Sequence, residues 1–187
     1  MNDAAIEAAV AHGIVDRDYH AELLGDLAHW VRLAGVTEAD VLSPLSSVCG
    51  PRESEWVRDL VARSLGPDDY GLVYLGSYAG DRGADVGARM RAIGAAAMRH
   101  YIDARVRGLA EAVDEADEGS TPTVLLLLDA ADDHGPAVQR RLGPMLLDRA
   151  RRQMPTVLHL EQLAGSDRLL GGSAHSLVEA HYLRVTK

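Results

Sequence analysis

The sequence predicts a single α/β domain over residues 1–187, with a Rossmann-like parallel sheet flanked by helices and a helical N-terminal segment over residues 1–36. Two observations predict this class. Residues 123–128 and 156–160 are apolar almost throughout, which is typical of strands buried on both faces of a sheet. Such segments alternate with stretches of helical periodicity, as in repeated βα units. A chain of 187 residues, 47% of them hydrophobic, suits one domain with a substantial core.

The first third of the chain predicts helices that pack on the sheet domain. Apolar residues recur at helical spacing, and Gly35 stops the pattern. The first run is Ile6, Val10 and Ile14, and the second is Tyr19, Leu23, Leu27 and Val31. Residues 40–43 form a short apolar stretch that predicts a strand before Pro44. Pro51 then opens a further helix, because proline is favoured in the first helical turn.

From residue 71 onward, strands and helices are expected to alternate. The expected order is a strand at 71–75, a long helix at 84–116, a strand at 123–128, a helix at 136–153, a strand at 156–160, a loop at 165–173 and a strand at 181–185. Connections of this length join parallel strands by right-handed crossovers.

Composition excludes several kinds of chemistry. The single cysteine, Cys49, excludes a disulfide framework and a multi-cysteine zinc site. The eight histidines do not show metal-ligand spacing, so we expect no metal and no other cofactor. Lys187 is the only lysine beside 18 arginines, so neither a buried Schiff-base lysine nor a phosphate-loop lysine is available.

The charge and hydropathy patterns bear on partners. The net charge of −9 argues against a surface that binds nucleic acid throughout, although it allows a local basic patch. The N-terminus lacks the basic and apolar regions of a signal peptide. The longest apolar run, residues 124–128, is far too short to span a membrane. We therefore expect no membrane partner and a cytoplasmic location.

Ligands of parallel sheets bind outside the carboxyl ends of the strands, so the residues there are the candidates for a site. Ser43 and Ser46 follow the stretch at 40–43, Ser77 follows the strand at 71–75, and Tyr182 lies in the last strand. Glu161 follows the strand at 156–160.

Among these candidates, the position of Glu161 most strongly suggests a function. Alternation along the strand places Val157, His159 and Glu161 on one face. A carboxylate at the end of a buried strand is costly unless it is paired or used in chemistry. The alternative is an exposed acid at a strand end.

Two segments resemble parts of a phosphate-binding fold. Residues 123–129 look like the strand and acid of a nucleotide triphosphatase, with Asp129 as the acid, but the partner motif G-x-x-x-x-G-K-[ST] is absent. Residues 76–80 are rich in glycine and lie between a strand and a helix, where they would suit an anion. The alternatives are a helix cap for Asp129 and a tight turn for residues 76–80.

Arginines gather on the expected long helix and suggest a phosphate-binding surface. Those singled out are Arg82, Arg89, Arg91, Arg99, Arg105 and Arg107. Guanidinium groups bind phosphate in a bidentate geometry, which suits a nucleic-acid backbone. The alternative is an ordinary solvated surface in a protein that uses arginine in place of lysine.

Taken in order, these pieces resemble the cyclodipeptide synthases over roughly residues 36–187. The family's nucleophilic serine, often followed by proline, matches Ser43 and Pro44. Its second motif is a tyrosine followed four positions later by a glutamate; Glu161 fits the glutamate, and Val157 stands at the tyrosine position. Its later loop and strand with a tyrosine match the segment that leads to Tyr182.

The resemblance implies an aminoacyl-tRNA-dependent aminoacyltransferase on a Rossmann-like fold, acting in dipeptide or natural-product biosynthesis. Ser43 would take an aminoacyl group, Glu161 would anchor its α-amine, and Tyr182 would help to position it. Substrate contacts would come from Ser46, Val157, His159 and Ser77, and the six arginines would hold tRNA phosphates. The second amine would come from another aminoacyl-tRNA or, with Val157 at the tyrosine position, from a small-molecule acceptor. This mechanism requires Ser43, Glu161 and Tyr182 to converge on one pocket.

Two other functions fit the same sequence. The first is a non-catalytic interaction module built on a nucleotide-binding fold. The second is a small-molecule transferase or hydrolase that uses Ser77 and the loop at 76–80. The location of the serine distinguishes this transferase or hydrolase from the aminoacyltransferase, because Ser77 rather than Ser43 would then share a pocket with Glu161.

Overall fold

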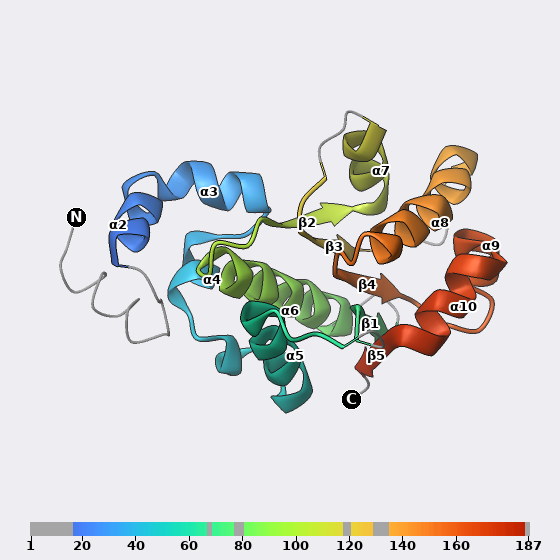
Figure 1. The fold of residues 1–187 in the computed structure, drawn as a ribbon, viewed down its shortest axis with the longest axis horizontal. Coiled ribbons are helices and arrows are strands. Elements are labelled where there is room, and N and C mark those ends of the chain that lie inside the picture. The colour runs from blue at the N-terminus through green and yellow to red at the C-terminus, as the bar shows by residue number, and fades with distance from the viewer. Residues whose placement is uncertain (1–16, 67–68, 77–80, 118–120, 129–134, 186–187) are drawn as a thin grey trace.

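The computed structural model describes residues 17–66, 69–76, 81–117, 121–128 and 135–185. Within these residues the chain forms a five-stranded parallel sheet with the order β2-β3-β4-β1-β5, flanked by helices (Figure 1). The strands are β1 (Gly71–Leu75), β2 (Ala104–Gly108), β3 (Val124–Leu128), β4 (Thr156–Leu160) and β5 (Tyr182–Val185). The predicted fold class, a Rossmann-like parallel sheet with helices around it, is confirmed.

Helices fill most of the remaining described chain. They are α2 (Arg17–Gly25), α3 (Leu27–Ala34), α4 (Glu38–Leu42), α5 (Pro51–Ala62), α6 (Asp81–Met98), α7 (Leu109–Asp117), α8 (Pro136–Arg151), α9 (Asp167–Leu170) and α10 (Gly172–His181), with a 3-10 turn η1 (Leu45–Ser47). Two sequence signals are confirmed at helix ends. Gly35 terminates α3 with a left-handed φ of 69°, and Pro51 begins α5. Within the described residues, no helix is both long and apolar enough to cross a membrane.

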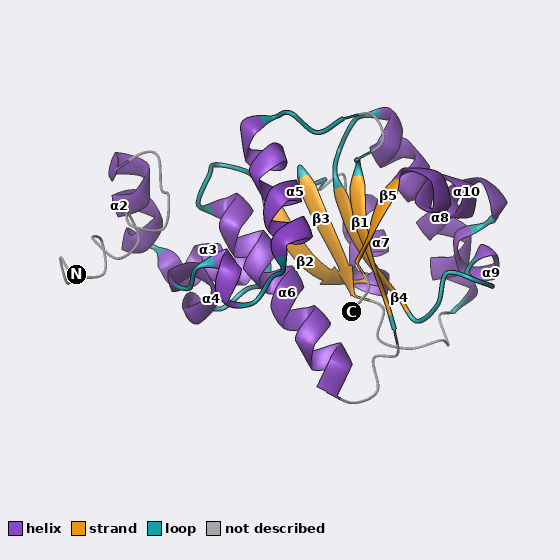
Figure 2. Cartoon of the chain, turned by 90° about the horizontal axis from the view of Figure 1, so that it is seen from below, coloured by secondary structure: helices purple, strands orange, loops and turns teal. Residues whose placement is uncertain are grey.

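The sheet separates two apolar cores, so the molecule has three layers (Figures 1 and 2). One core packs α3, α4, α5 and α6 against one face, and includes Met90 and Ile93 of α6. The other core packs α7, α8, α9 and α10 against the opposite face, and includes Leu142 and Leu146 of α8. Adjacent residues of one strand serve different cores, because side chains alternate across a sheet. The sheet is therefore covered on both faces, as its apolar strands predicted.

Three predicted boundaries are wrong. Residues 40–43 do not form a strand, because α4 occupies Glu38–Leu42. The Thr37 side chain accepts a hydrogen bond from the Asp40 amide, while the Asp40 carboxylate accepts one from the Thr37 amide. This capping box starts a helix where the apolar stretch suggested a strand.

The expected long helix at 84–116 ends at Met98, and the chain then forms β2 and α7. Tyr101 adopts a left-handed φ of 63°, which turns the chain between α6 and β2. Arg105 and Arg107, expected on the helix, therefore lie on a strand. The third error concerns the loop at 165–173, which contains α9 and the start of α10.

Candidate functional site

The connections of the chain change direction between β1 and β4. From β1 the chain passes through α6 to β2 at one edge of the sheet, and from β4 it passes through α9 and α10 to β5 at the other edge. The helix α6 lies on one face, and α9 and α10 lie on the other. In open parallel sheets, ligands bind at the carboxyl ends of strands whose connections leave in this way, a position called the switch point of the sheet. The switch point between β1 and β4 is the candidate ligand site.

Gly76 follows β1 at the switch point and is joined to β4 by two hydrogen bonds. Its amide donates to the Leu160 carbonyl over 3.0 Å, and its carbonyl lies 2.8 Å from His159 Nε2. A carbonyl only accepts, so His159 Nε2 carries the proton in this contact. Gly76 has a φ of 147°, a conformation that side chains disfavour, and within the described part of the chain no atom lies within 4 Å of the place where a Cβ would be. The hydrogen bonds to β4 therefore hold the backbone of Gly76 in a conformation that suits glycine.

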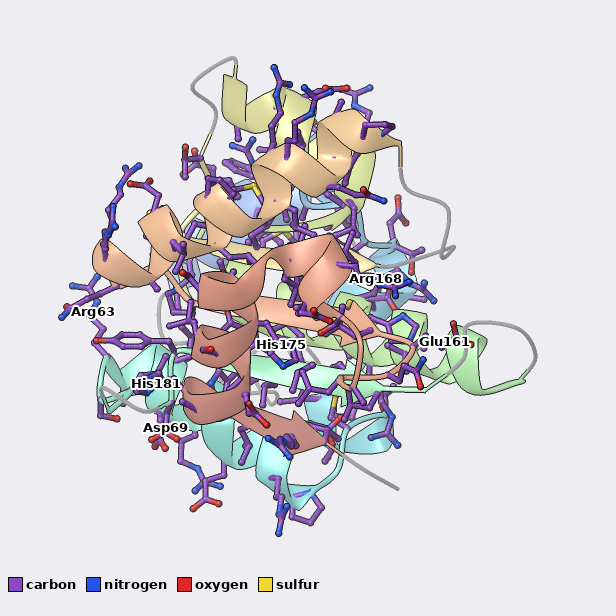
Figure 3. All side chains as sticks on the ribbon, turned by 90° about the vertical axis from the view of Figure 1, so that its right-hand side faces the viewer. Arg63, Asp69, Glu161, Arg168, His175 and His181 are labelled. Atoms are coloured by element: carbon purple, nitrogen blue, oxygen red, sulfur yellow. The ribbon has the colours of Figure 1, made fainter. Side chains whose placement is uncertain are left out.

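Glu161 follows β4 directly and is exposed. Figure 3 shows it on the side of the molecule where α6 begins. The arrowheads of the strands and the first turn of α6 point to this same side (Figure 2). Ser77 and Asp129, the other residues expected at the carboxyl ends, lie outside the described residues. Among the described residues, no group of three or more His, Cys, Asp or Glu side chains could hold a metal ion.

Ser43, Glu161 and Tyr182 do not converge, so the expected three-residue site is wrong. Tyr182 begins β5 and is in register with Gly71, which pairs with Thr156 at the start of β4. Glu161 follows the end of β4, roughly 16 Å further along the strand direction at about 3.3 Å per residue. Figure 3 shows the two ends, with Glu161 on one side and His181, the neighbour of Tyr182, on the other.

Tyr182 is buried at the amino end of the sheet, in the core formed with α8 and α10. Burial raises the pKa of its hydroxyl to about 12, although Thr156 and Arg149 act in the opposite direction. Its ring occupies the space beside Gly71, where no side chain fits. Tyr182 is therefore a core residue.

Ser43 lies at the end of a helix on the opposite face of the sheet from Tyr182. Its carbonyl accepts a hydrogen bond from Arg99 Nη1 over 2.8 Å, and the Val41 carbonyl accepts one from the same atom over 2.6 Å. Arg99 follows the last residue of α6, and its own pKa is lowered by burial. Ser46, expected to bind substrate, is exposed in η1, and Val157 is fully buried in the core beneath α6.

The arginines expected to bind tRNA, apart from Arg82, make contacts to carboxylates or backbone carbonyls of the protein. Arg89 Nη1 contacts both carboxylate oxygens of the buried Glu53 at 2.9 and 3.1 Å. Arg107 is 7% exposed and donates to Glu115 and to the Leu33 carbonyl. Arg91, Arg99 and Arg105 contact Asp40, the α4 carbonyls and Asp103, respectively. For Arg82 only the backbone, in α6, is described.

These contacts give the described arginines partners within the fold. A guanidinium that donates to carbonyls and carboxylates of the protein is held in place by them. Arg89, Arg91 and Arg99 join α6 to α5, α4 and Ser43, and Arg107 joins β2 to α3. The sequence shows their number but not their partners, which are remote in the chain.

A serine–histidine contact lies between the start of α9 and α10, away from the switch point. Ser166 Oγ lies 3.0 Å from His175 Nδ1, and His175 Nε2 lies 4.0 Å from a Glu179 carboxylate oxygen. Ser166 Oγ donates its one proton to the Leu163 carbonyl over 2.9 Å. His175 must therefore donate to Ser166, which is the reverse of what activates a serine nucleophile. This contact stabilises the connection between α9 and α10.

Comparison of the chain with protein-family models and with curated proteins found no match.

Proposed function

We propose that the protein is a binding module for a phosphate-bearing small molecule, such as a nucleotide, held at the switch point between β1 and β4. One observation carries the proposal, namely the change of direction between the connections of these two adjacent strands. In open parallel sheets this is where ligands bind. The proposal follows the expectation of a nucleotide-fold module more closely than that of an aminoacyltransferase.

The phosphate would bind at the beginning of α6. This helix has 18 residues and begins on the side of the sheet where the strands end (Figure 2). The first turn of a helix has backbone amides without a partner in the helix and carries the positive end of the helix dipole, which favours an anion. Gly76 supports the assignment, because a glycine, which has no Cβ, lets a ligand approach the backbone closely.

His159 would act as a positioning residue. Its side chain is 1% exposed, and its contact with the Gly76 carbonyl fixes the end of β1 relative to β4. Glu161 is exposed at the neighbouring strand end and would face the ligand's metal or sugar hydroxyls rather than its phosphates, since like charges repel. We expect binding without rapid hydrolysis, because phosphate-loop triphosphatases use a loop lysine that this sequence lacks.

The test is titration of the protein with a fluorescent N-methylanthraniloyl derivative of ATP in the presence of Mg²⁺, followed by competition with pyrophosphate. We expect saturable binding that pyrophosphate reverses. Gly76→Ala should weaken binding tenfold or more, because the side chain strains the backbone where α6 is positioned.

Gly171→Ala is the matched control. Gly171 also has a positive φ, 76°, and an open Cβ direction, but it lies between α9 and α10. Both variants carry a similar backbone penalty, so a general loss of stability would affect them alike. Absence of binding to the unmodified protein, or equal weakening by the two substitutions, would overturn the proposal.

A further inference from the structure

A cavity lies between α7 and α8, at the opposite end of the sheet from the switch point between β1 and β4. Its volume is about 480 Å³, which is within the range of small-molecule sites. It lies over Leu125 of β3 and beside Pro122, which precedes that strand. The position separates it from every residue that the proposed function uses.

The floor of this cavity is apolar. Ala112, Val113 and Leu125 are buried there, and Met145 of α8 is half-buried beside them. Apolar side chains offer no hydrogen bonds to a polar guest, so the inner part of the cavity suits a hydrocarbon or an aromatic body.

The rim of the cavity is cationic. Arg140, Arg141 and Arg152 are exposed along α8, and the buried Arg149 also lines the cavity. Within the described part of the chain, the contact that Arg140 makes is to a backbone carbonyl, that of Pro136, and not to a carboxylate. The protein as a whole carries a net charge of −9, so this concentration of arginine is local.

Among the described residues, two acids also line the cavity, and Asp148 pairs with one of the rim arginines. Glu115 contacts Arg105 and Arg107 of β2, which already balance its charge from the sheet side. Asp148 lies 3.4 Å from Arg152, its neighbour one turn later in α8. A guest that enters between the helices therefore meets guanidinium groups at the entrance and an apolar surface beneath them.

We infer that this cavity binds a small amphipathic anion, a carboxylate or phosphate monoester with an apolar body. The anionic group would contact Arg140 and its neighbours at the rim, and the apolar body would lie against Val113 and Leu125. The positive charge of the rim disfavours cations. A cavity with a polar rim and an apolar floor suits a free small molecule better than an extended surface such as a lipid membrane.

Decanoate and decyl phosphate are the probes, with decyltrimethylammonium as the cationic control, all below their micellar concentrations. Calorimetric titration should show saturable binding of both anions, weakened by added salt, and much weaker binding of the cation. Arg140→Gln should weaken decanoate binding by about tenfold, the loss expected for one charge-assisted contact. Arg151→Gln, on the same helix but outside the cavity, should leave it unchanged.

Ala116→Trp provides an independent variant, because it places a large side chain at the half-buried wall of the cavity. It should abolish decanoate binding while the circular dichroism spectrum and cooperative unfolding are retained. Failure of both anions to bind, equal affinity for the cation, or unchanged affinity in Arg140→Gln would overturn the inference. Binding only to vesicles of anionic lipid, without binding of free decanoate, would also overturn it.

Discussion

Arg149 is expected to be among the side chains most important for stability, because it joins three segments at the amino end of the sheet. Its side chain is 2% exposed. Nε donates to Thr156 Oγ1 over 2.9 Å, and the two terminal nitrogens donate to the carbonyls of Pro122, Thr123 and Pro155. Burial lowers the pKa of Arg149 to about 10, so the group is still charged at neutral pH. Arg149→Met keeps most of the apolar stem and removes all four donations.

The expected loss follows from these contacts. A hydrogen bond from a charged group contributes about 1.5–3 kcal/mol, and buried carbonyls without donors carry their own penalty. The four bonds share one side chain whose burial itself costs several kcal/mol, so they do not add. We expect Arg149→Met to lower the free energy of unfolding by about 3–5 kcal/mol, a large part of the total for a domain.

Urea denaturation followed by circular dichroism measures this change. Arg151→Met is the control, since Arg151 is exposed two residues further along α8 and should leave the midpoint almost unchanged. If both variants unfold at the same urea concentration, the hydrogen bonds of Arg149 do not stabilise the sheet and the reasoning is refuted.

Three further predictions concern other parts of the fold. Glu53 is 2% exposed and accepts hydrogen bonds from Arg89 and from the Tyr74 hydroxyl. Glu53→Gln should therefore lower the free energy of unfolding by roughly 3 kcal/mol, whereas Glu55→Gln, at an exposed position, should leave it unchanged. Equal urea midpoints for the two variants would contradict this. Burial, and then the charge of Arg99, lower the pKa of His100. The unfolded chain therefore binds a proton at this imidazole more readily, so its contribution to stability is present above about pH 6.5 and is lost as the pH falls. His100→Gln should reduce the loss of stability between pH 7 and pH 5, and an unchanged slope would exclude this role. For Ser43, we expect no aminoacyl adduct by mass spectrometry after incubation with charged tRNAs, whereas an adduct that Ser43→Ala abolishes would restore the aminoacyltransferase prediction.

The central strands could be predicted from the sequence because a strand buried on both faces has a continuous run of apolar residues. β1, β3 and β4 are apolar at nearly every position, and the structure places them in the middle of the sheet. β2 could not be predicted in this way. It lies at an edge and carries Arg105 and Arg107, whose burial depends on Glu115, a partner eight or more residues away.

The start of α4 shows a signal that periodicity alone missed. Thr37 and Asp40 have the spacing of a capping box, which outweighs the short apolar stretch that follows. The candidate site was predictable in part. The carboxyl end of β4, with Glu161, was expected, but the switch point depends on strand order, and local patterns in the sequence do not give the strand order.

The position of β1 has a consequence for how the molecule assembles. Gly71 pairs with Thr156 and with Tyr182, so both neighbours of β1 are supplied from about 85 residues or more further along the chain. β2 and β3, by contrast, pair across about 20 residues. Loop closure is slower for distant partners, so α6, β2, α7 and β3 should form a folding nucleus into which β4, β1 and β5 enter late. Until then the apolar edges of β1 are open to pairing with other chains, and α5 and α6 are the elements available to shield it.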